Sequence, residues 1–238
     1  MSLTLSLAAV DVLAQLLGVD PRRYPLEIPS VGDRAEDRVR IARAVLADLG
    51  ARGLVGEDGV DPRVERALRA LAEAEVAVAV AGSPDSGDLV RARAAVRAGY
   101  AVIAVQEGQF LRFTPVGPDT LPRALVALLP RVPAGPGQSV RVGGSPPERP
   151  AGITEAVRAP RTAAQTQLRV AEEVLTRPRT GFGAFTVTHL ATDTATLTWL
   201  DTDAGRYLGL ARPDTDEITY SPADGPRLAR QLADLMAR

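Results

Sequence analysis

Apolar and polar positions along the chain follow two different periods, and each change of period marks a new predicted element. Near the N-terminus the apolar residues are spaced three or four apart, which places them on one face of a helix over residues 3–17. Those residues are Leu3, Leu7, Val10, Leu13 and Leu17. Asp11 and Gln15 interrupt the apolar stretch, so the segment is expected to be an amphipathic helix packed on a core rather than a signal peptide.

Two further helices are expected before the first sheet strands. Asp33 and Glu36 have the spacing of a capping box and precede an apolar stripe formed by Val39, Ala42, Leu46 and Leu49, which ends at Gly50 and Gly53. Asp61 followed by Pro62 is typical of a helix start, and the helix that follows is expected to bury Val64, Leu68 and Leu71.

The period then changes to two, which indicates strands. Strands are predicted over residues 75–81 and 89–96, joined by a loop over 82–88, and a hairpin over 100–105 and 109–114 turns at Gly108. Arg91 and Arg93 are in phase on the second strand, so one of its faces must be hydrated or must face acidic groups. A helix over 121–129 completes this part of the chain.

The second half repeats this order of elements after a segment rich in proline and glycine. Residues 131–152 cannot hold a helix, although a short strand is expected at 139–142. A helix over about 161–177 ends at Pro178. Strands follow over 185–190, 194–200, 206–211 and 217–222, and a last helix over 224–237 places Leu228, Leu232 and Leu235 on one face. We therefore expect an N-terminal half over 1–130, a linker over 131–160 and a C-terminal half over 161–238, in one integrated domain.

An internal repeat supports this division. The segment Phe113-Thr114-Pro115 matches Tyr220-Ser221-Pro222, and the same sequence offset carries a leucine stripe and its flanking residues across without a gap. The further matches are Tyr100 to Tyr207, Leu121 to Leu228, Arg123 to Arg230, Leu125 to Leu232 and Leu128 to Leu235. The predicted fold class is therefore α+β, with a central antiparallel sheet flanked by helical bundles and two similar halves related by a pseudo-two-fold axis.

Composition excludes several classes of function. The chain of 238 residues is 45% hydrophobic and has a net charge of −1, with its basic residues all arginine, so it lacks the cationic excess of a nucleic-acid binder. It has no cysteine and a single histidine, which excludes thiolate sites and multi-histidine metal sites. No apolar run is long enough to span a membrane. We expect a cytoplasmic protein without metal or cofactor, without membrane insertion and without a nucleic-acid partner.

The segment WLDTDAGRYL, residues 199–208, contains the most suggestive candidate for chemistry. A calcium loop that starts at Asp201 would need glycine at its sixth position and glutamate at its twelfth, where the chain has Arg206 and Arg212. Carboxylates in a short hairpin loop are usually solvated, which argues against Asp201 and Asp203 as an acid–base pair. The segment is better interpreted as a hairpin turn, since aspartate and glycine suit tight turns.

Other candidate sites are weaker. His189 is in phase with Phe185 and Val187 on a predicted strand, where a lone histidine is more often structural than catalytic. No G-x-S-x-G elbow is present, the loop AGSPDSGD lacks the ending of a phosphate loop, and GFGAF precedes a strand instead of following one. A small hydrolase that uses Asp201, Asp203 or His189 remains the alternative hypothesis, and weak self-association of the chain is a further one.

A surface for a partner remains as the main hypothesis. Most of the few aromatic residues lie in or beside the C-terminal sheet, where an open face would offer an apolar groove with aromatic anchors. The candidate partner-binding residues are Phe182, Phe185, Leu197, Trp199 and Tyr207. Packing in the core is the alternative explanation for the same residues.

Several segments together resemble the EspG family of ESX (type VII) secretion-associated proteins of actinobacteria. They are YPLEIPS, YAVIAVQEGQFLRFTPVGPDTL, PAGPGQSV, WLDTDAGRYL and YSPADGPRLARQLADL, and the resemblance covers nearly the whole chain. It implies an α+β fold with a quasi-two-fold between halves and a cytosolic chaperone without enzymatic activity. It also implies a partner, the hydrophobic tip of the PPE subunit in PE–PPE-like heterodimers, which the chaperone keeps soluble and directs to the secretion machinery.

Overall fold

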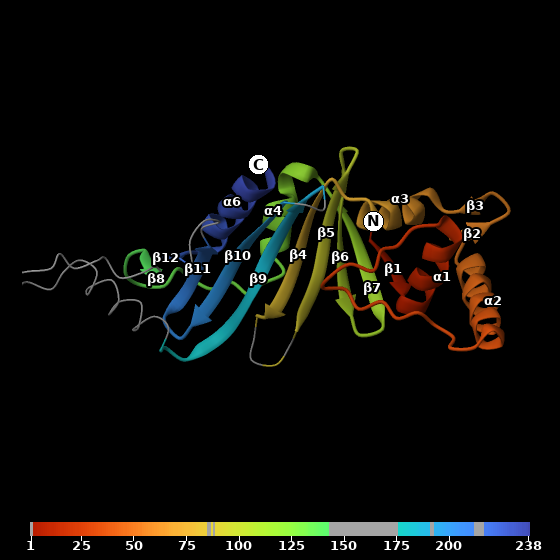
Figure 1. Ribbon diagram of the computed structural model, residues 1–238, viewed down its shortest axis with the longest axis horizontal. Coiled ribbons are helices and arrows are strands. Elements are labelled where there is room, and N and C mark those ends of the chain that lie inside the picture. The colour runs from red at the N-terminus through yellow and green to blue at the C-terminus, as the bar shows by residue number, and fades with distance from the viewer. Residues whose placement is uncertain (1, 85–86, 88, 143–175, 191–192, 212–216) are drawn as a thin grey trace, which may run out of the picture.

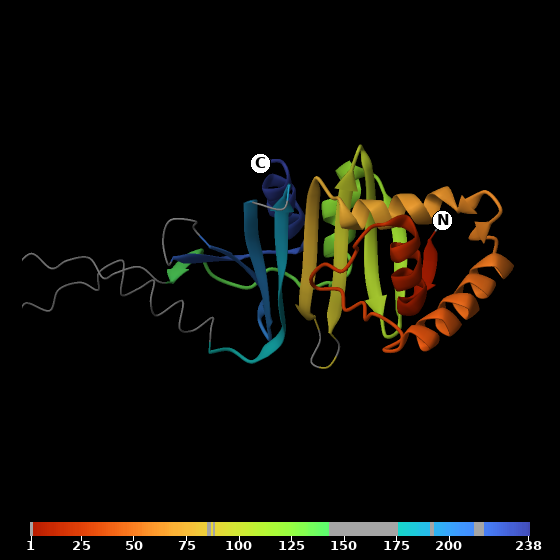
Figure 2. The same cartoon turned by 45° about the vertical axis from the view of Figure 1, so that its right-hand side comes forward.

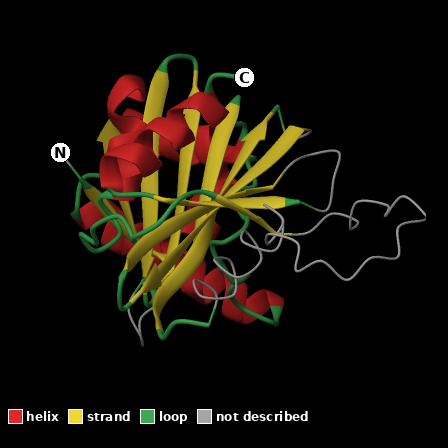
Figure 3. Ribbon diagram, turned by 90° about the vertical axis from the view of Figure 1, so that its left-hand side faces the viewer, coloured by secondary structure: helices red, strands yellow, loops and turns green. Residues whose placement is uncertain are grey.

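A ten-stranded antiparallel sheet runs through the molecule in the order β1-β7-β6-β5-β4-β9-β10-β11-β12-β8, and helices lie against both of its faces (Figures 1 and 3). The structure is a computed structural model that describes residues 2–84, 87, 89–142, 176–190, 193–211 and 217–238. The α+β class and the central antiparallel sheet predicted from the sequence are therefore confirmed.

The N-terminus corrects the prediction of a single helix over residues 3–17. Strand β1 (Leu3–Ser6) pairs with β7 (Phe110–Val116), and only then does α1 (Leu7–Leu17) begin. The Ser6 hydroxyl accepts a hydrogen bond from the Ala9 amide at 3.1 Å and so caps the helix. Pairing with the edge of the sheet outweighs the helical spacing of the leucines. The outer side of β1 is closed in part by Arg52, which donates to the Thr4 carbonyl at 2.7 Å.

Helix α2 (Ala35–Ala51) forms where it was expected, but its predicted cap and stripe are wrong. Its N-cap is Arg34, with no side-chain hydrogen bond, so Asp33 and Glu36 do not form a capping box. Of the predicted stripe only Leu49 is buried, and Val39 is 49% exposed. Polar contacts attach the helix instead: buried Asp11 accepts from the Val31 amide at 3.0 Å and forms ion pairs with Arg22 and Arg38.

The elements from residue 55 to residue 129 follow the sequence closely. A small hairpin of β2 (Val55–Gly56) and β3 (Gly59–Val60) leads into α3 (Pro62–Ala72), whose N-cap Asp61 accepts from the Arg63 amide at 2.7 Å. Strands β4 (Val76–Ser83), β5 (Val90–Arg97), β6 (Tyr100–Glu107) and β7 form a meander, with Gly108 at φ 58° in the last turn. The 3-10 helix η1 (Pro118–Thr120) and α4 (Leu121–Val126) follow.

The C-terminal half forms a second meander. The predicted short strand is β8 (Val140–Val142), and the predicted helix over 161–177 lies almost entirely outside the described residues, as does most of the linker. Strands β9 (Arg179–His189), β10 (Asp193–Thr202), β11 (Gly205–Ala211) and β12 (Ile218–Pro222) precede helix α6 (Gly225–Met236). Strand β9 begins earlier than predicted, because GFGAF pairs with β4 and β10 instead of forming a loop.

Two hydrophobic clusters lie on opposite faces of the sheet. Helices α4 and α6 bury one face, where Val78, Phe185 and Leu197 pack with Leu125 and Leu232. Helices α1 and α3 bury the other face, but only over the N-terminal half; the sheet residues beneath them include Ala95, Val102, Ala104, Leu111 and Phe113. Figure 2 shows α1 and α3 in front of β5, β6 and β7, with α4 behind these strands.

The strand–turn–helix unit predicted from the repeat is present twice. Strand β7 leads to α4 and strand β12 leads to α6, and the two helices pack together. The repeat-related pairs Leu121 and Leu228, and Leu125 and Leu232, are all fully buried. The two meanders meet at the antiparallel pair β4–β9 in the middle of the sheet.

Candidate partner-binding site

The sheet face opposite α4 and α6 differs between the two halves. In the C-terminal half it carries mainly small and hydroxyl side chains along β9 and β10, which are half-buried or exposed, whereas Leu200 and Tyr207 on the same face are buried. Strand alternation and register place these residues on one face: Ala184, Thr186, Thr188, Thr194, Thr196, Thr198, Gly209 and Tyr220. We call this surface the open face. Between residues 176 and 238 no described helix lies on it.

One end of the open face is hollowed into a groove. Two cavities of about 470 and 300 Å³ share Tyr24, Ala81 and Gly82 as lining residues. The larger one extends over Phe182, Ala184, Thr198, Leu200 and Tyr220, and the smaller one over Leu89 and Arg91. We call the two together the sheet groove. Large apolar side chains at its rim are exposed to solvent: Phe182 is 56%, Leu89 63% and Tyr24 69% exposed.

The wall of the sheet groove next to the N-terminal half is the connector of residues 24–28. Arg93 donates to the Tyr24 carbonyl at 3.0 Å, Arg91 pairs with Glu27 at 3.2 Å, and the Glu27 amide donates to Gln106 at 2.8 Å. Arg91 and Arg93 thus face this connector, and the pairing of Arg91 with Glu27 agrees with the prediction that their face of the strand is hydrated or meets acidic groups. Burial lowers the pKa of Arg93, and the neighbouring Arg23 lowers it further.

The floor of the sheet groove rests on Trp199, which explains Gly183 of GFGAF and Gly82 of the neighbouring strand. The indole lies on the covered face, 1% exposed, with its ring centroid 5.1 Å from that of Phe185. A Cβ at Gly183 would lie 2.3 Å from the indole, and a Cβ at Gly82 would lie 3.0 Å from it. The glycines are therefore required for the close packing of the single tryptophan against β4 and β9.

The predicted partner-binding residues separate into core and surface. Phe185 and Leu197 are fully buried, and Trp199 and Tyr207 are each 1% exposed, so core packing accounts for these side chains. The Tyr207 hydroxyl donates to the Pro136 carbonyl at 2.9 Å. Phe182 remains at the surface, at the rim of the sheet groove. Tyr24, Thr198 and Tyr220 were missed, although threonine at alternate positions of β9 and β10 is a sequence signal for a hydrated sheet face.

Asp201 corrects the expectation of a solvated carboxylate. The hairpin turn is confirmed, with Thr202 opposite Gly205, but Asp201 lies one residue before it and is 1% exposed. Both of its oxygens accept from Arg206, at 2.6 Å from Nε and 2.7 Å from Nη2. The spacing of the aspartates does not indicate this cross-strand pair. Asp203 lies in the turn and is exposed.

The Asp201–Arg206 pair holds the segment that follows α4. Arg206 Nη2 donates to the Pro130 carbonyl at 3.1 Å, the Arg206 amide donates to Pro133 at 2.8 Å, and the Gly135 amide donates to Arg206 at 3.0 Å. A Cβ at Gly205 would lie 2.7 Å from the Gly135 nitrogen, so this close approach requires glycine. The conspicuous segment WLDTDAGRYL is therefore a structural clamp on residues 130–135.

The structure does not bring the residues of the hydrolase hypothesis together. Register places Asp201 opposite Gly181 and His189 opposite Asp193, at the two ends of β9. At about 3.3 Å per residue this separates them by roughly 26 Å. His189 Nε2 lies 3.0 Å from the Leu235 carbonyl of α6, a structural contact. Within the described ranges, no group of three or more His, Cys, Asp or Glu side chains could hold a metal ion.

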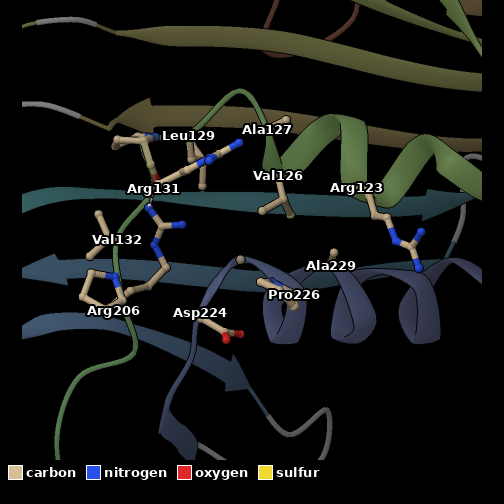
Figure 4. A pocket seen from close by; sticks show the side chains of 13 residues that line it. Arg123, Val126, Ala127, Leu129, Arg131, Val132, Arg206, Asp224, Pro226 and Ala229 are labelled. Atoms are coloured by element: carbon tan, nitrogen blue, oxygen red, sulfur yellow. Dashed lines mark hydrogen bonds between the residues drawn. The ribbon is translucent and has the colours of Figure 1, made fainter.

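A further cavity of about 570 Å³ lies on the opposite side of the sheet, between α4, the start of α6 and residues 129–133 (Figure 4). Its walls are largely apolar, with Val126, Leu129, Val132 and Ala229 among the lining residues. Figure 4 shows the Arg206 guanidinium beside Val132 at one end and Arg123 at the other. We call it the helix cavity.

These features define an α+β protein with a large antiparallel sheet that is helix-covered in one half and grooved in the other. The chain belongs to the EspG family, whose model matches residues 6–234. It is similar in fold to EspG5, a type VII secretion system chaperone of Mycobacterium tuberculosis solved in complex with the PE25–PPE41 dimer. That match has a TM-score of 0.65 at 14% identity and covers 98% of this chain and 95% of that one.

A search of curated proteins finds no match to the chain. Among the residues that the structure describes, no helix combines the length and the hydropathy needed to cross a bilayer.

Proposed function

We propose that the chain is a cytosolic chaperone of type VII secretion, which binds the hydrophobic tip of the PPE-like subunit in a PE–PPE-like heterodimer. Membership of the EspG family and the partner present in the EspG5 complex support this proposal. Binding keeps the substrate soluble and directs it to the secretion machinery, and it requires no catalytic residue in the chaperone.

The observation that carries the proposal is the sheet groove with exposed Phe182 at its rim. Small residues on the open face let a partner approach the strands closely, and the aromatic and aliphatic rim supplies anchors. The groove and open face together offer a surface for a complex of ordinary size, which buries about 1,200–2,000 Å² in total. Of the other predicted partner-binding residues, Phe185, Leu197 and Trp199 pack beneath this surface in the core, and Phe182 is the predicted contact.

The proposal includes the organisation of the chain. We infer that residues 1–130 and 161–238 are two related halves of one domain, joined by the linker over 131–160 and related by a pseudo-two-fold axis. The paired meanders and the fully buried leucines shared by α4 and α6 support this arrangement. The axis would pass between β4 and β9, at the border between the covered half and the open half of the sheet.

The test is co-expression with the PE–PPE-like pair of the same organism, followed by size-exclusion chromatography. We expect a stable heterotrimer. Phe182→Asp should weaken it by about tenfold or more, because a charge then replaces an apolar anchor. Phe110→Asp is the matched control, since Phe110 is 50% exposed on β7, outside the sheet groove, and should leave the complex intact. Failure to co-elute with any such pair would refute the function, and equal effects of the two variants would refute the site.

A further inference from the structure

The helix cavity is a second, preformed pocket that the proposed chaperone site does not use. It lies on the face covered by α4 and α6, whereas the sheet groove lies on the opposite face. Its volume of about 570 Å³ is within the usual range of ligand pockets, which is about 300–1,000 Å³. Its lining is mostly aliphatic, with alanine, valine, leucine and proline side chains.

The wall of the helix cavity is fixed by buried structure. Residues 129–133 form one side, and the hydrogen bonds of Arg206 to the Pro130 and Pro133 carbonyls hold that side in place. Arg206 is itself paired with Asp201, so it holds this wall in place without adding net charge to the cavity. A pocket held in this way loses little conformational entropy when it binds a ligand.

The surroundings of the helix cavity are cationic. Arg123 and Arg131 line it and are exposed, and Arg227 and Arg230 follow on the exposed side of α6. Within the described part of the chain these arginines form no ion pair, whereas most other arginines do. The opposing charges on these helices are Asp224, which caps α6 by accepting from the Arg227 amide at 2.9 Å, and Asp234.

We propose that the helix cavity is a docking site for an acidic segment of a protein partner that inserts a large aliphatic side chain. The aliphatic walls take the side chain, and Arg123 and Arg131 take carboxylates on either side of it. A nucleic acid fits less well, because single strands bind on aromatic platforms and no aromatic residue is among the described residues that line the cavity. The helix cavity shares no lining residue with the larger cavity of the sheet groove, so the two proposed binding sites can be tested separately.

The experiment uses the full chain and a fluorescein-labelled peptide of sequence EDLLED, with binding measured by fluorescence anisotropy at low salt. We expect saturable binding that weakens as salt is added, because exposed charge pairs are screened. A peptide of sequence KKLLKK should not bind, and EDGGED should bind more weakly because it lacks the aliphatic side chains. Equal binding of either control peptide, or displacement of EDLLED by a single-stranded oligonucleotide at equal concentration, would overturn the proposal.

Variants locate the site. The double variant Arg123→Glu/Arg131→Glu should weaken peptide binding by about tenfold or more. Arg34→Glu/Arg43→Glu makes the same change of charge at two exposed positions, the N-cap of α2 and a residue within it, and should change the affinity less than about twofold. Ala127→Trp, at an exposed position of the lining, should block the cavity.

Equal effects of the two double variants would mean that only net charge matters, and the proposal would fail. Unchanged binding by Ala127→Trp, confirmed as folded by circular dichroism, would also refute it. Because all of these positions lie outside the sheet groove, co-elution with a PE–PPE-like pair should persist in every variant, which separates this proposal from the proposed function.

Discussion

The two halves of the sheet have the same meander topology, but they differ on the face opposite α4 and α6. In the N-terminal half, α1 and α3 cover Ala95, Val102 and Leu111, all fully buried. In the C-terminal half the corresponding face carries half-buried threonines on β9 and β10. Within the described part of the chain, the repeated meander is therefore covered by helices over apolar positions in one copy and carries hydroxyl side chains at the alternate strand positions of the other.

The same substitution in each half should give the largest contrast. Ala95→Arg places a charge beneath α3 with no partner and should lower the free energy of unfolding by about 4 kcal/mol or more. Thr196→Arg, on the open face, should change it by less than about 0.5 kcal/mol. Urea denaturation followed by circular dichroism measures both. Similar losses in the two variants would mean that the open face is covered as tightly as the other.

A buried aspartate in each half gives the next contrast. Arg206→Met leaves the Asp201 carboxylate buried without its partner and should cost about 3–5 kcal/mol, most of which the double variant Asp201→Leu/Arg206→Met should recover. Asp11→Asn should cost less, about 1–2 kcal/mol, because its partners Arg22 and Arg38 are 39% and 21% exposed and can turn to water. A smaller loss for Arg206→Met than for Asp11→Asn in urea titrations would contradict the assignment of the clamp.

Glycine in a strand and glycine in a turn should differ in a smaller but measurable way. Gly183→Ala would push a methyl group into Trp199 and should lower stability by about 1–3 kcal/mol. Gly108→Ala, in the hairpin of the N-terminal half, meets open space and should cost only the backbone strain of its positive φ, about 1 kcal/mol. Thermal unfolding would compare them, and a larger effect at Gly108 would refute the packing explanation.

The smallest expected effects concern helix caps. Asp224→Ala removes the acceptor for the Arg227 amide of α6 and should cost about 1 kcal/mol. Arg34→Ala, at the uncapped start of α2, should cost close to nothing. Chemical denaturation of the two variants would measure both changes in the free energy of unfolding. Equal losses of stability would show that the side-chain cap of α6 contributes no more than the uncapped start of α2.

Local features were predictable from the sequence and long-range ones were not. Asp61 with Pro62 predicted α3, and Gly108 predicted its hairpin, because the relevant interactions join residues close in the chain. Leu3–Ser6 was predicted as helix because its partner strand lies more than a hundred residues away in sequence. Asp201 was expected to be solvated as part of a short hairpin loop. Its partner Arg206 is near in the sequence, but the segment that Arg206 binds, residues 130–133, lies far back in the chain.

The candidate site followed the same division. Phe182 was proposed as a contact because most of the few aromatic residues lie in or beside the C-terminal sheet, and it lines the sheet groove. Tyr24 lies in the other half of the chain and reaches the sheet groove only through the tertiary fold. Core and surface roles of Phe185 and Trp199 could not be separated by alternation alone, since burial depends on which face the helices cover.

The packing of Trp199 also provides an intrinsic fluorescence probe of the sheet groove. It is the only tryptophan in the chain, its indole N–H has no hydrogen-bond partner within the described residues, and it lies directly beneath the sheet groove. Its emission therefore comes from one known place, with no background from a second indole in this chain. Any occupant that shifts Gly183 or Phe185 changes the surroundings of that single fluorophore, so the groove can be followed in real time without attaching a label.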